Sequence, residues 1–380
     1  MQVRQCVLIT VDTLTPLSSM LSQFDADLIL VFADQPFLLH QPLQTLLRQS
    51  GALVTGCSTA GEIAGMKVLD HQAVITAVRF SHSQVRLVST PINGMPDSHD
   101  GAARLAAELA PQNLRAVMIL ATGLNTNGSA LISGLQQHLP EETQIFGGLA
   151  GDYAQFSETF VLGHDGPHNH SALAIGFYGD KLHITNVAAG GWQPFGPYRK
   201  VTRASENILY ELDGQPALDV YKSYLGEYAD QLPSSGLLFP LEMVNEARES
   251  CGLVRTILNI DECEGSLVLA GDVIPNGYLR LMFASNEGLA GGAEMAARLA
   301  TQRHTYPLTS DCLMLLISCV GRKVIMGDLI EDEIDSVVQL SRPPMVTGFY
   351  SYGEIGTHKL SGQCVFHNQT MTVSLISEAS

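Results

Sequence analysis

The sequence carries one eight-residue pattern twice, GCSTAGEI at Gly56–Ile63 and GFYSYGEI at Gly348–Ile355, here called the GEI motif. Each copy follows a short β-type apolar run, ALVT in the first case and PMVT in the second. Two glycines allow the chain to leave a strand through a tight turn, and the turn ends on a carboxylate, Glu62 or Glu354. The motif therefore predicts two related units with matching polar strand ends around one cleft, although glycine turns can also be alike by chance.

The rest of the chain alternates short apolar runs with amphipathic segments. Four runs are rich in Val, Ile and Leu and are typical of buried strands: Asp27–Ala33, Ala52–Cys57, Arg115–Thr122 and Cys312–Val320. Helical spacing of apolar residues appears in Asp100–Leu109 and Gly128–Leu139, and Asn286–Ala300 is predicted to be an Ala/Gly-rich helix. Hairpin-like turns are too frequent for a purely parallel sheet. We expect a mixed α/β (α+β) protein of two related units, residues 1–190 and 191–380, each with mixed sheets and covering helices.

Composition excludes several classes of protein. The 380 residues are 46% hydrophobic and 16% charged, with a net charge of -17, so a large core is expected and disorder is not. An acidic chain without a basic run is a poor candidate for binding nucleic acid or anionic lipid. The N-terminus lacks a signal-peptide pattern, no apolar run reaches membrane-spanning length, and the seven cysteines form no CxxC. We therefore expect a cytoplasmic protein with no membrane partner.

Enzyme signatures in the first GEI motif are incomplete. GCSTAGE is similar to the start of a phosphate-binding loop, but Glu62 stands at the lysine position and would repel a phosphate. Ser58 lacks the second glycine of a nucleophile elbow and has no assignable partner histidine. Cys57 could act as a thiol nucleophile, yet a small residue at a strand end usually serves packing. A nucleophilic enzyme is the weakest of the hypotheses.

Two other segments carry candidate binding residues. GLNTNGS at Gly123–Ser129 joins a strand to a helix, so Asn125 and its neighbours would lie beside free helix N–H groups that favour an anionic or carbonyl ligand. Plain N-capping of that helix explains the same residues equally well. Arg322, just past the strand Cys312–Val320, could bind a carboxylate bidentately or pair with the acidic segment Asp328–Asp335.

Histidines raise the question of a metal or haem. Three of the twelve lie in HDGPHNH at His164–His170, where glycine, proline and asparagine indicate a solvent-facing turn. His183 lies in the strand-like KLHITNV, shortly before Trp192, the single tryptophan. Such a histidine is usually half-buried and hydrogen-bonded, and a haem ligand is the sharper alternative.

Together these segments resemble the FIST family of bacterial intracellular sensory proteins, over roughly residues 20–378. The resemblance is carried by GCSTAGEI, IFGGLAGD (Ile145–Asp152), GWQPFGP, Val201–Gly226, SCVGR (Ser318–Arg322), GFYSYGEIG and VFHNQT (Val365–Thr370). It implies N- and C-terminal FIST domains that bind a small ligand and signal to another protein, and it implies no enzyme. Some members are proposed to bind amino acids. Stand-alone members are haem proteins that sense nitric oxide and regulate a histidine kinase or a cyclic-di-GMP enzyme.

Two hypotheses of ligand sensing follow. In the first, haem b is held by His183 and nitric oxide is the signal for a partner histidine kinase or cyclic-di-GMP enzyme; His304 and His358 remain open as ligands, and His367 looks general to the family. In the second, a haem-free receptor binds an amino acid or similar metabolite. Its site would be formed by Ser58, Thr59, Gly61, Glu62, Asn125, Arg322, Tyr350, Ser351 and Glu354. Glu62 or Glu354 would bind the ammonium group of the ligand, and Arg322 or a helix N-terminus would bind its carboxylate. A homodimer is compatible with both.

Overall fold

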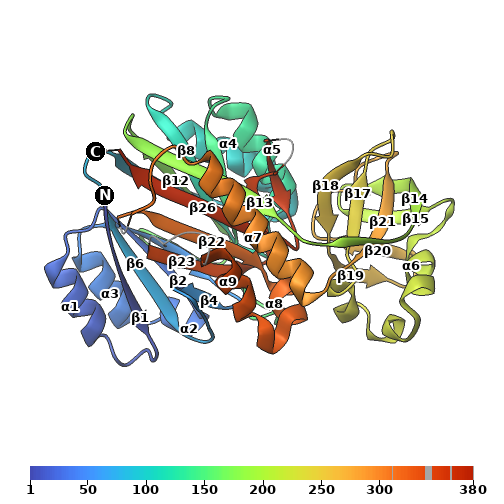
Figure 1. The fold of residues 1–380 in the computed structure, drawn as a ribbon, viewed down its shortest axis with the longest axis horizontal. Coiled ribbons are helices and arrows are strands. Elements are labelled where there is room, and N and C mark those ends of the chain that lie inside the picture. The colour runs from blue at the N-terminus through green and yellow to red at the C-terminus, as the bar shows by residue number, and fades with distance from the viewer. Residues whose placement is uncertain (310, 339–344, 360–361, 380) are drawn as a thin grey trace.

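A computed structural model describes residues 1–309, 311–338, 345–359 and 362–379. Within these residues the chain forms three six-stranded mixed sheets with covering helices, and a separate β-rich part that stands at the right of Figure 1. The mixed α/β class expected from the sequence is confirmed.

The three six-stranded sheets share one topology, because three consecutive stretches of chain fold in the same order: strand, helix, strand, helix, strand, hairpin, strand. The first repeat comprises β1 (Gln2–Leu8), α1 (Thr15–Gln23), β2 (Leu28–Ala33), α2 (Gln35–Leu38), α3 (Gln41–Gln49), β3 (Leu53–Ser58), β4 (Glu62–Ala64), β5 (Lys67–Leu69) and β6 (Ala73–Arg79). The second comprises β7 (Gln84–Pro91), α4 (Ser98–Glu108), β8 (Leu114–Ala121), α5 (Gly128–His138), β9 (Gln144–Leu149), β10 (Val161–Gly163), β11 (Gly166–His168) and β12 (Ser171–Tyr178). The third comprises β13 (Leu182–Ala189), α7 (Asn286–Arg303), β22 (Leu313–Cys319), α8 (Val320–Met326), α9 (Glu331–Val338), β23 (Met345–Ser351), β24 (Gly353–Thr357), β25 (Cys364–His367) and β26 (Met371–Glu378). We call these three repeats the body.

The third repeat contains a long insertion between β13 and α7, which we call the β domain. Its elements are β14 (Gln193–Ser205), β15 (Ile208–Leu212), β16 (Gln215–Pro216), α6 (Ala217–Leu225), β17 (Leu241–Val244), β18 (Ser250–Arg255), β19 (Ile257–Asp261), β20 (Ser266–Leu269) and β21 (Tyr278–Phe283). The β domain has a hydrophobic cluster of its own, in which Leu209, Leu218 and Leu267 are fully buried or nearly so.

Each repeat gives its hairpin to the sheet of another repeat. β4 of the first repeat pairs with β23 of the third, β24 of the third pairs with β9 of the second, and β10 of the second pairs with β3 of the first. The exchange closes into a ring, so two of the three sheets contain strands from both sides of residue 190.

The repeats explain the glycine of the GEI motif and reveal a third copy of it. A Cβ on Gly56, Gly147 or Gly348 would lie less than 2 Å from a carbonyl oxygen of the neighbouring parallel strand, so a side chain is excluded at all three positions. The third copy is IFGGLAGD, in which a longer loop separates the strand from its hairpin. By strand register, Val161 takes the position of Glu62 and Glu354. The sequence therefore displays two copies where the structure has three.

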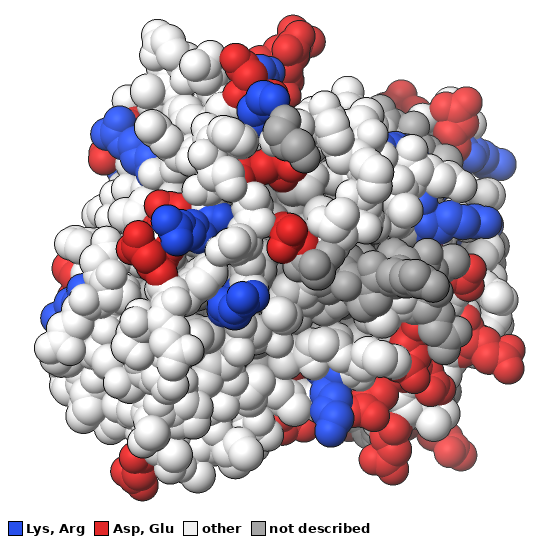
Figure 2. All heavy atoms as spheres, turned by 60° about the vertical axis from the view of Figure 1, so that its left-hand side comes forward, with Lys and Arg blue, Asp and Glu red and all other residues white. Residues whose placement is uncertain are grey.

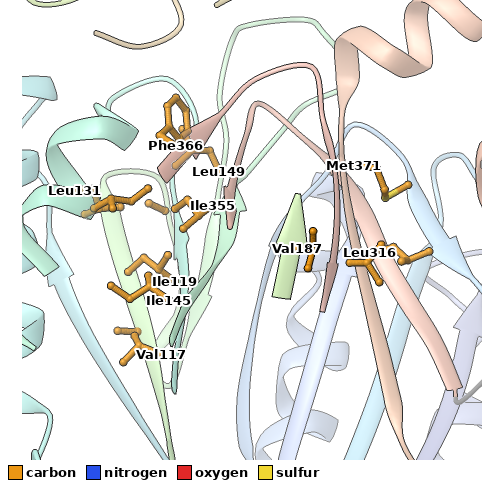
Figure 3. Packing of buried hydrophobic residues seen from close by; sticks show 14 of the residues in the cluster. Val117, Ile119, Leu131, Ile145, Leu149, Val187, Leu316, Ile355, Phe366 and Met371 are labelled. Atoms are coloured by element: carbon orange, nitrogen blue, oxygen red, sulfur yellow. The ribbon is translucent and has the colours of Figure 1, made fainter. Parts of the chain in front are cut away.

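Alternating side chains of the central strands belong to different hydrophobic clusters. Leu30, Met118 and Leu315 come from equivalent strands of the three repeats and meet in one cluster between the sheets. The intervening residues, such as Ile119 and Leu316, face the helices. Figure 3 shows Val117, Ile119 and Ile145 of the second repeat in one group, and Leu316 and Met371 of the third repeat in another. This period of two is that of strands covered on both faces.

Charge is distributed without a dominant basic surface on the face shown in Figure 2. Among the described residues of that face, lysine and arginine side chains stand singly between acidic ones, with large uncharged areas around them. Within the described ranges, no helix combines the length and the apolar character needed to cross a membrane.

Candidate functional site

A cavity lies where the second repeat, the third repeat and the β domain meet. Its volume is about 80 Å³, several times the ~10–15 Å³ that one water molecule requires. The lining residues come from all three parts: Met95, Gly123, Leu124, Thr126, Asn127, Leu149, Phe156, Asn207, Leu237, Thr256, Leu258, Leu269, Ala270, Gly271, Cys319, Val320, Tyr352 and Asn368. We call it the Asn368 cavity, because both side-chain polar atoms of Asn368 lack a partner among the described residues.

Three lining residues carry buried polar atoms that no described residue satisfies. Neither Oδ1 nor Nδ2 of Asn368 has a hydrogen-bond partner, and the same is true of the hydroxyls of Thr126 and Thr256. Asn368 is 1% exposed, Thr126 4% and Thr256 3%. A buried polar group without a partner costs about 1–3 kcal/mol, and polar atoms of this kind beside a cavity can be satisfied by a bound ligand or by ordered water.

Asn368 is held in place by its neighbours in the loop between β25 and β26. Gln369 adopts a left-handed backbone with φ of 62°, and its Nε2 donates to the Leu237 carbonyl at 3.1 Å. Its own carbonyl accepts from Trp192 Nε1 at 2.9 Å. Arg255 Nη1 donates to the Phe366 carbonyl at 3.0 Å. The loop is therefore fixed to the β domain on both sides of Asn368.

The opposite side of the cavity is the start of α5. Asn127 caps this helix by accepting the N–H groups of Ser129 at 3.0 Å and Ala130 at 3.2 Å. Its Nδ2 donates to Asp272 Oδ1 at 2.9 Å, which links the body to the β domain. The capping role predicted for this loop is confirmed, and the loop also lines the cavity, through Thr126 and Asn127.

An aromatic pair forms part of the lining. The rings of Phe156 and Tyr352 stack with centroids 4.8 Å apart, and the Tyr352 hydroxyl donates to Asp152. Asp152 also accepts the N–H groups of Ser157 at 2.7 Å and Glu158 at 3.0 Å. The long loop that is specific to the second repeat is thereby folded against the cavity.

The two glutamates of the GEI motif are buried away from this cavity. Glu62 accepts hydrogen bonds from Thr59, from Tyr153 at 2.9 Å and from the Gln72 N–H at 3.2 Å. Burial raises its pKa to about 7, although these hydrogen bonds act in the opposite direction. Glu354 is equivalent, and burial raises its pKa to about 8. Glu354 is satisfied within its own repeat, whereas Glu62 is satisfied by its own repeat and by Tyr153 of the second repeat.

Some of the other residues predicted for a metabolite site lie together: the Tyr350 N–H donates to the Gly61 carbonyl at 2.8 Å, and Tyr350 and Arg322 both donate to Glu333. Ser58 donates to the Gly151 carbonyl at 2.7 Å, Ser351 donates to Glu354 at 2.7 Å, and Tyr350 donates to Glu333 at 3.0 Å. Gly61 has a positive φ and lies against Lys323. Asn125 contacts His170 at 2.9 Å. None of the nine predicted residues, all in the described part of the chain, lines the Asn368 cavity.

Arg322 is fully buried and paired within the protein. Its Nε donates to Glu333 Oε1 at 2.5 Å and its Nη2 to the Leu289 carbonyl at 2.8 Å, and it also contacts the Gly190 carbonyl. The alternative in which Arg322 pairs with the acidic segment thus describes the structure, through Glu333 of α9. The arginine joins α8, α9, the start of α7 and the end of β13.

His183, the haem ligand expected from the sequence, lies in largely polar surroundings. Its ring packs on Tyr306 with centroids 4.0 Å apart, and its Nδ1 lies 3.4 Å from the Thr305 hydroxyl. The groove beside it is lined largely by polar and charged side chains, including Glu141, Glu142, Thr185, Asn186 and Arg303. A haem needs apolar surface against both faces of the macrocycle, so these surroundings do not fit one. In the described residues, no group of three or more His, Cys, Asp or Glu side chains could hold a metal ion.

The other histidines and the proposed nucleophile have structural surroundings. His304 lies 2.8 Å from the Ser377 hydroxyl and 3.1 Å from that of Thr185. Burial lowers the pKa of His367 to about 3. Cys57 is fully buried beside Phe32, and burial raises the pKa of its thiol, which disfavours the thiolate that a nucleophile requires.

Comparison with known families identifies the class of this protein. Residues 27–215 match the FIST N domain and residues 217–357 match the FIST C domain. The chain therefore belongs to the FIST family, whose domains are associated with signal transduction and ligand sensing. The division between the two matches, at residue 216, falls inside the β domain.

Individual relatives share only part of their sequence with this chain. An uncharacterized protein of Mycobacterium tuberculosis is 27% identical over 64% of this chain and 63% of its own length. One from Methanocaldococcus jannaschii is 34% identical over 22% of this chain and 16% of its own. The chain thus covers less than two thirds of these relatives. Among solved structures, cyanuric acid hydrolase from A. caulinodans aligns over 100% of this chain and 99% of its own, with 8% identity and a TM-score of 0.39, too low a similarity to bear on function.

Proposed function

We propose that this protein is a ligand-sensing receptor whose small-molecule ligand binds in the Asn368 cavity, between the body and the β domain. The observation that carries the proposal is the carboxamide of Asn368, which is buried and has no partner among the described residues. A buried carboxamide that lacks partners reduces the stability of the protein. Ligand binding is a physical reason why such a residue is retained despite this cost.

The position of the cavity suits a sensor. Asn127 with Asp272 and Arg255 with the Phe366 carbonyl are contacts between body and β domain that flank it. A ligand that touches both parts favours the arrangement in which they are held together, and a differential contact of this kind is what any ligand-driven switch requires. A histidine kinase or cyclic-di-GMP enzyme as the partner that reads this arrangement stays a prediction from the family resemblance.

Binding and stability should respond in opposite directions to substitution at the cavity. We expect Asn368→Ala and the isosteric Thr256→Val to leave the unliganded protein equally or more stable, because each removes an unsatisfied polar group. Both should lose the thermal stabilisation that a binding metabolite gives the wild type. Asn259→Ala, at an exposed position on β19, is the matched control and should retain it.

A metabolite screen by thermal shift with these variants tests the proposal. If every stabilising compound acts equally on wild type, Asn368→Ala and Thr256→Val, the ligand site lies elsewhere and the proposal is wrong. A large loss of unliganded stability in both variants would also contradict it, since it would show that Asn368 and Thr256 have structural partners.

A further inference from the structure

The lining of the Asn368 cavity indicates the chemistry of its ligand, and this step rests on the proposed function. We infer that the ligand is uncharged and presents a cis secondary amide to Asn368, with N–H and C=O side by side on one edge. Lactams, cyclic imides, cyclic dipeptides and pyrimidine bases share this edge.

Charge is the first argument. Among the described residues that line the cavity there is no Asp, Glu, Lys, Arg or His. Arg255 and Asp272 adjoin lining residues in the chain, but the protein already uses them: Arg255 donates to the carbonyls of Phe366 and Asp272, and Asp272 accepts from Asn127. A free amino acid would bring two charges into a site without counter-charges, and the desolvation of each is costly. The amino-acid ligand expected from the family resemblance does not suit this lining.

The carboxamide of Asn368 is the second argument. An asparagine side chain offers an acceptor oxygen and donor hydrogens on one planar group. Both the oxygen and the nitrogen of Asn368 are buried and lack a described partner, so a ligand that reached this edge would satisfy both atoms. A cis amide is complementary to this edge and can form two parallel hydrogen bonds with it, as asparagine does with the paired donor and acceptor of a nucleobase. A trans peptide places its N–H and C=O on opposite sides and can form only one.

The other lining residues fit a small ring. Phe156, Tyr352 and Leu124 supply apolar surface for its faces. The hydroxyls of Thr126 and Thr256, each able to donate or accept, provide for polar atoms elsewhere on the ring. The cavity, at about 80 Å³, is smaller than the ~150 Å³ that holds a benzene ring, so it excludes an extended chain and even a small ring would have to widen it.

Matched probes separate the ligand classes. δ-Valerolactam has the cis amide edge; N-methyl-δ-valerolactam lacks only the N–H; 5-aminovalerate is the ring-opened, doubly charged form. Each is titrated at millimolar concentration by ligand-observed NMR against wild type, Asn368→Ala, Thr256→Val and Asn259→Ala. Uracil and cyclo(Gly-Leu) serve as larger neutral probes, with free leucine as their charged counterpart.

We expect the lactam to bind wild type and Asn259→Ala at least tenfold more tightly than its N-methyl derivative, and Asn368→Ala to lose at least tenfold. Tighter binding of 5-aminovalerate or leucine, abolished by Asn368→Ala, would overturn the neutral-amide class while leaving the cavity as the receptor site. Equal binding of lactam and N-methyl lactam would overturn the two-bond pairing. If no probe binds, or if both cavity variants leave the binding of every probe unchanged, the inference is overturned. Either result would also count against the site itself.

Discussion

Glu62 and Glu354 occupy the same position in two of the three repeats and perform the same task. Each carboxylate accepts the backbone N–H of the residue immediately before the last strand of its repeat: Gln72 donates to Glu62 at 3.2 Å, and Thr370 donates to Glu354 at 3.1 Å. Each also accepts from a hydroxyl three residues earlier, on Thr59 or Ser351. The two turns therefore share one geometry, in which a buried carboxyl fixes the start of the last strand of its repeat.

Stability should fall as the pH rises because of these two groups. Their folded-state pKa values of about 7 and about 8 lie above the ~4.3 of an unfolded chain. The folded state therefore binds their protons more tightly, and the stabilisation present below pH 4 is lost as the pH rises through 7 and 8. Between pH 5.5 and 8.5 we expect the Tm of Glu354→Gln to rise relative to wild type, by the equivalent of about 3 kcal/mol.

Thermal unfolding monitored by circular dichroism across this range provides the measurement, with Glu62→Gln as the second variant. Glu142→Gln, on the surface, is the control and should track wild type. A constant difference between Glu354→Gln and wild type at all pH values would show that Glu354 is ionised throughout.

Replacing only one member of the Arg322–Glu333 pair should strongly reduce the stability of the protein. Both side chains are fully buried, so Arg322→Met leaves Glu333 without its counter-charge, and we expect a loss of about 3–5 kcal/mol in the free energy of unfolding. Replacing both residues together, as Arg322→Met with Glu333→Leu, should recover part of that loss because no unpaired charge remains. Urea denaturation of the single and double variants tests this, and a double variant less stable than the sum of its singles would contradict it.

The close contact at Gly348 should reject even a methyl group. A Cβ there would lie 1.9 Å from the Leu316 carbonyl oxygen, so Gly348→Ala must separate β22 from β23, and we expect a loss of about 2 kcal/mol or more. Gly291 of α7 is the contrasting control, since a Cβ there meets nothing within 4 Å. Gly291→Ala should gain about 0.5–1 kcal/mol from helix propensity. Equal stability of the two variants in urea would show that the parallel strands lie further apart.

The body should fold without the β domain. Gln193 and Phe283 are antiparallel partners at the base of the β domain, so a Gly-Gly linker in place of residues 193–283 can join the chain. We expect the shortened protein to unfold cooperatively, with a loss of about 1–3 kcal/mol from contacts such as Gln369 to the Leu237 carbonyl, and to lose ligand binding. A protein without a thermal transition would show that body and β domain form one folding unit.

Strands and helices of the body were largely predictable, and the reason is periodicity. Arg115–Thr122 corresponds to β8 (Leu114–Ala121), and Asn286–Ala300 lies within α7 (Asn286–Arg303). The second repeat was not recognisable as a copy of the GEI motif, because the loop after Leu149 displaces the hairpin and Val161 replaces the glutamate. Pairing across the ring of hairpins leaves no periodic signal at all, since β4 and β23 are far apart in the chain.

The candidate site was predicted in part. The loop Gly123–Ser129 was identified because a strand followed by an asparagine-capped helix exposes N–H groups, and it does line the cavity. Asn368 lies in VFHNQT (Val365–Thr370), a segment that the sequence distinguishes only by its resemblance to the family. Asn368 is a candidate because its amide has no hydrogen-bond partner among the described residues. The lack of a partner depends on the three-dimensional surroundings, and no residue pattern encodes it.

The ring of exchanged hairpins has a consequence for synthesis of the chain. Ile63 finds its strand partner in Gly348, so when the first repeat leaves the ribosome its β4–β5 hairpin has an unpaired edge, and most of the protein must be translated before that edge is covered. Long-range pairings of this kind slow folding and leave strand edges open to intermolecular association. The nascent chain should therefore depend on protection during translation, and truncation just before β23 should release an aggregation-prone product although two repeats are present.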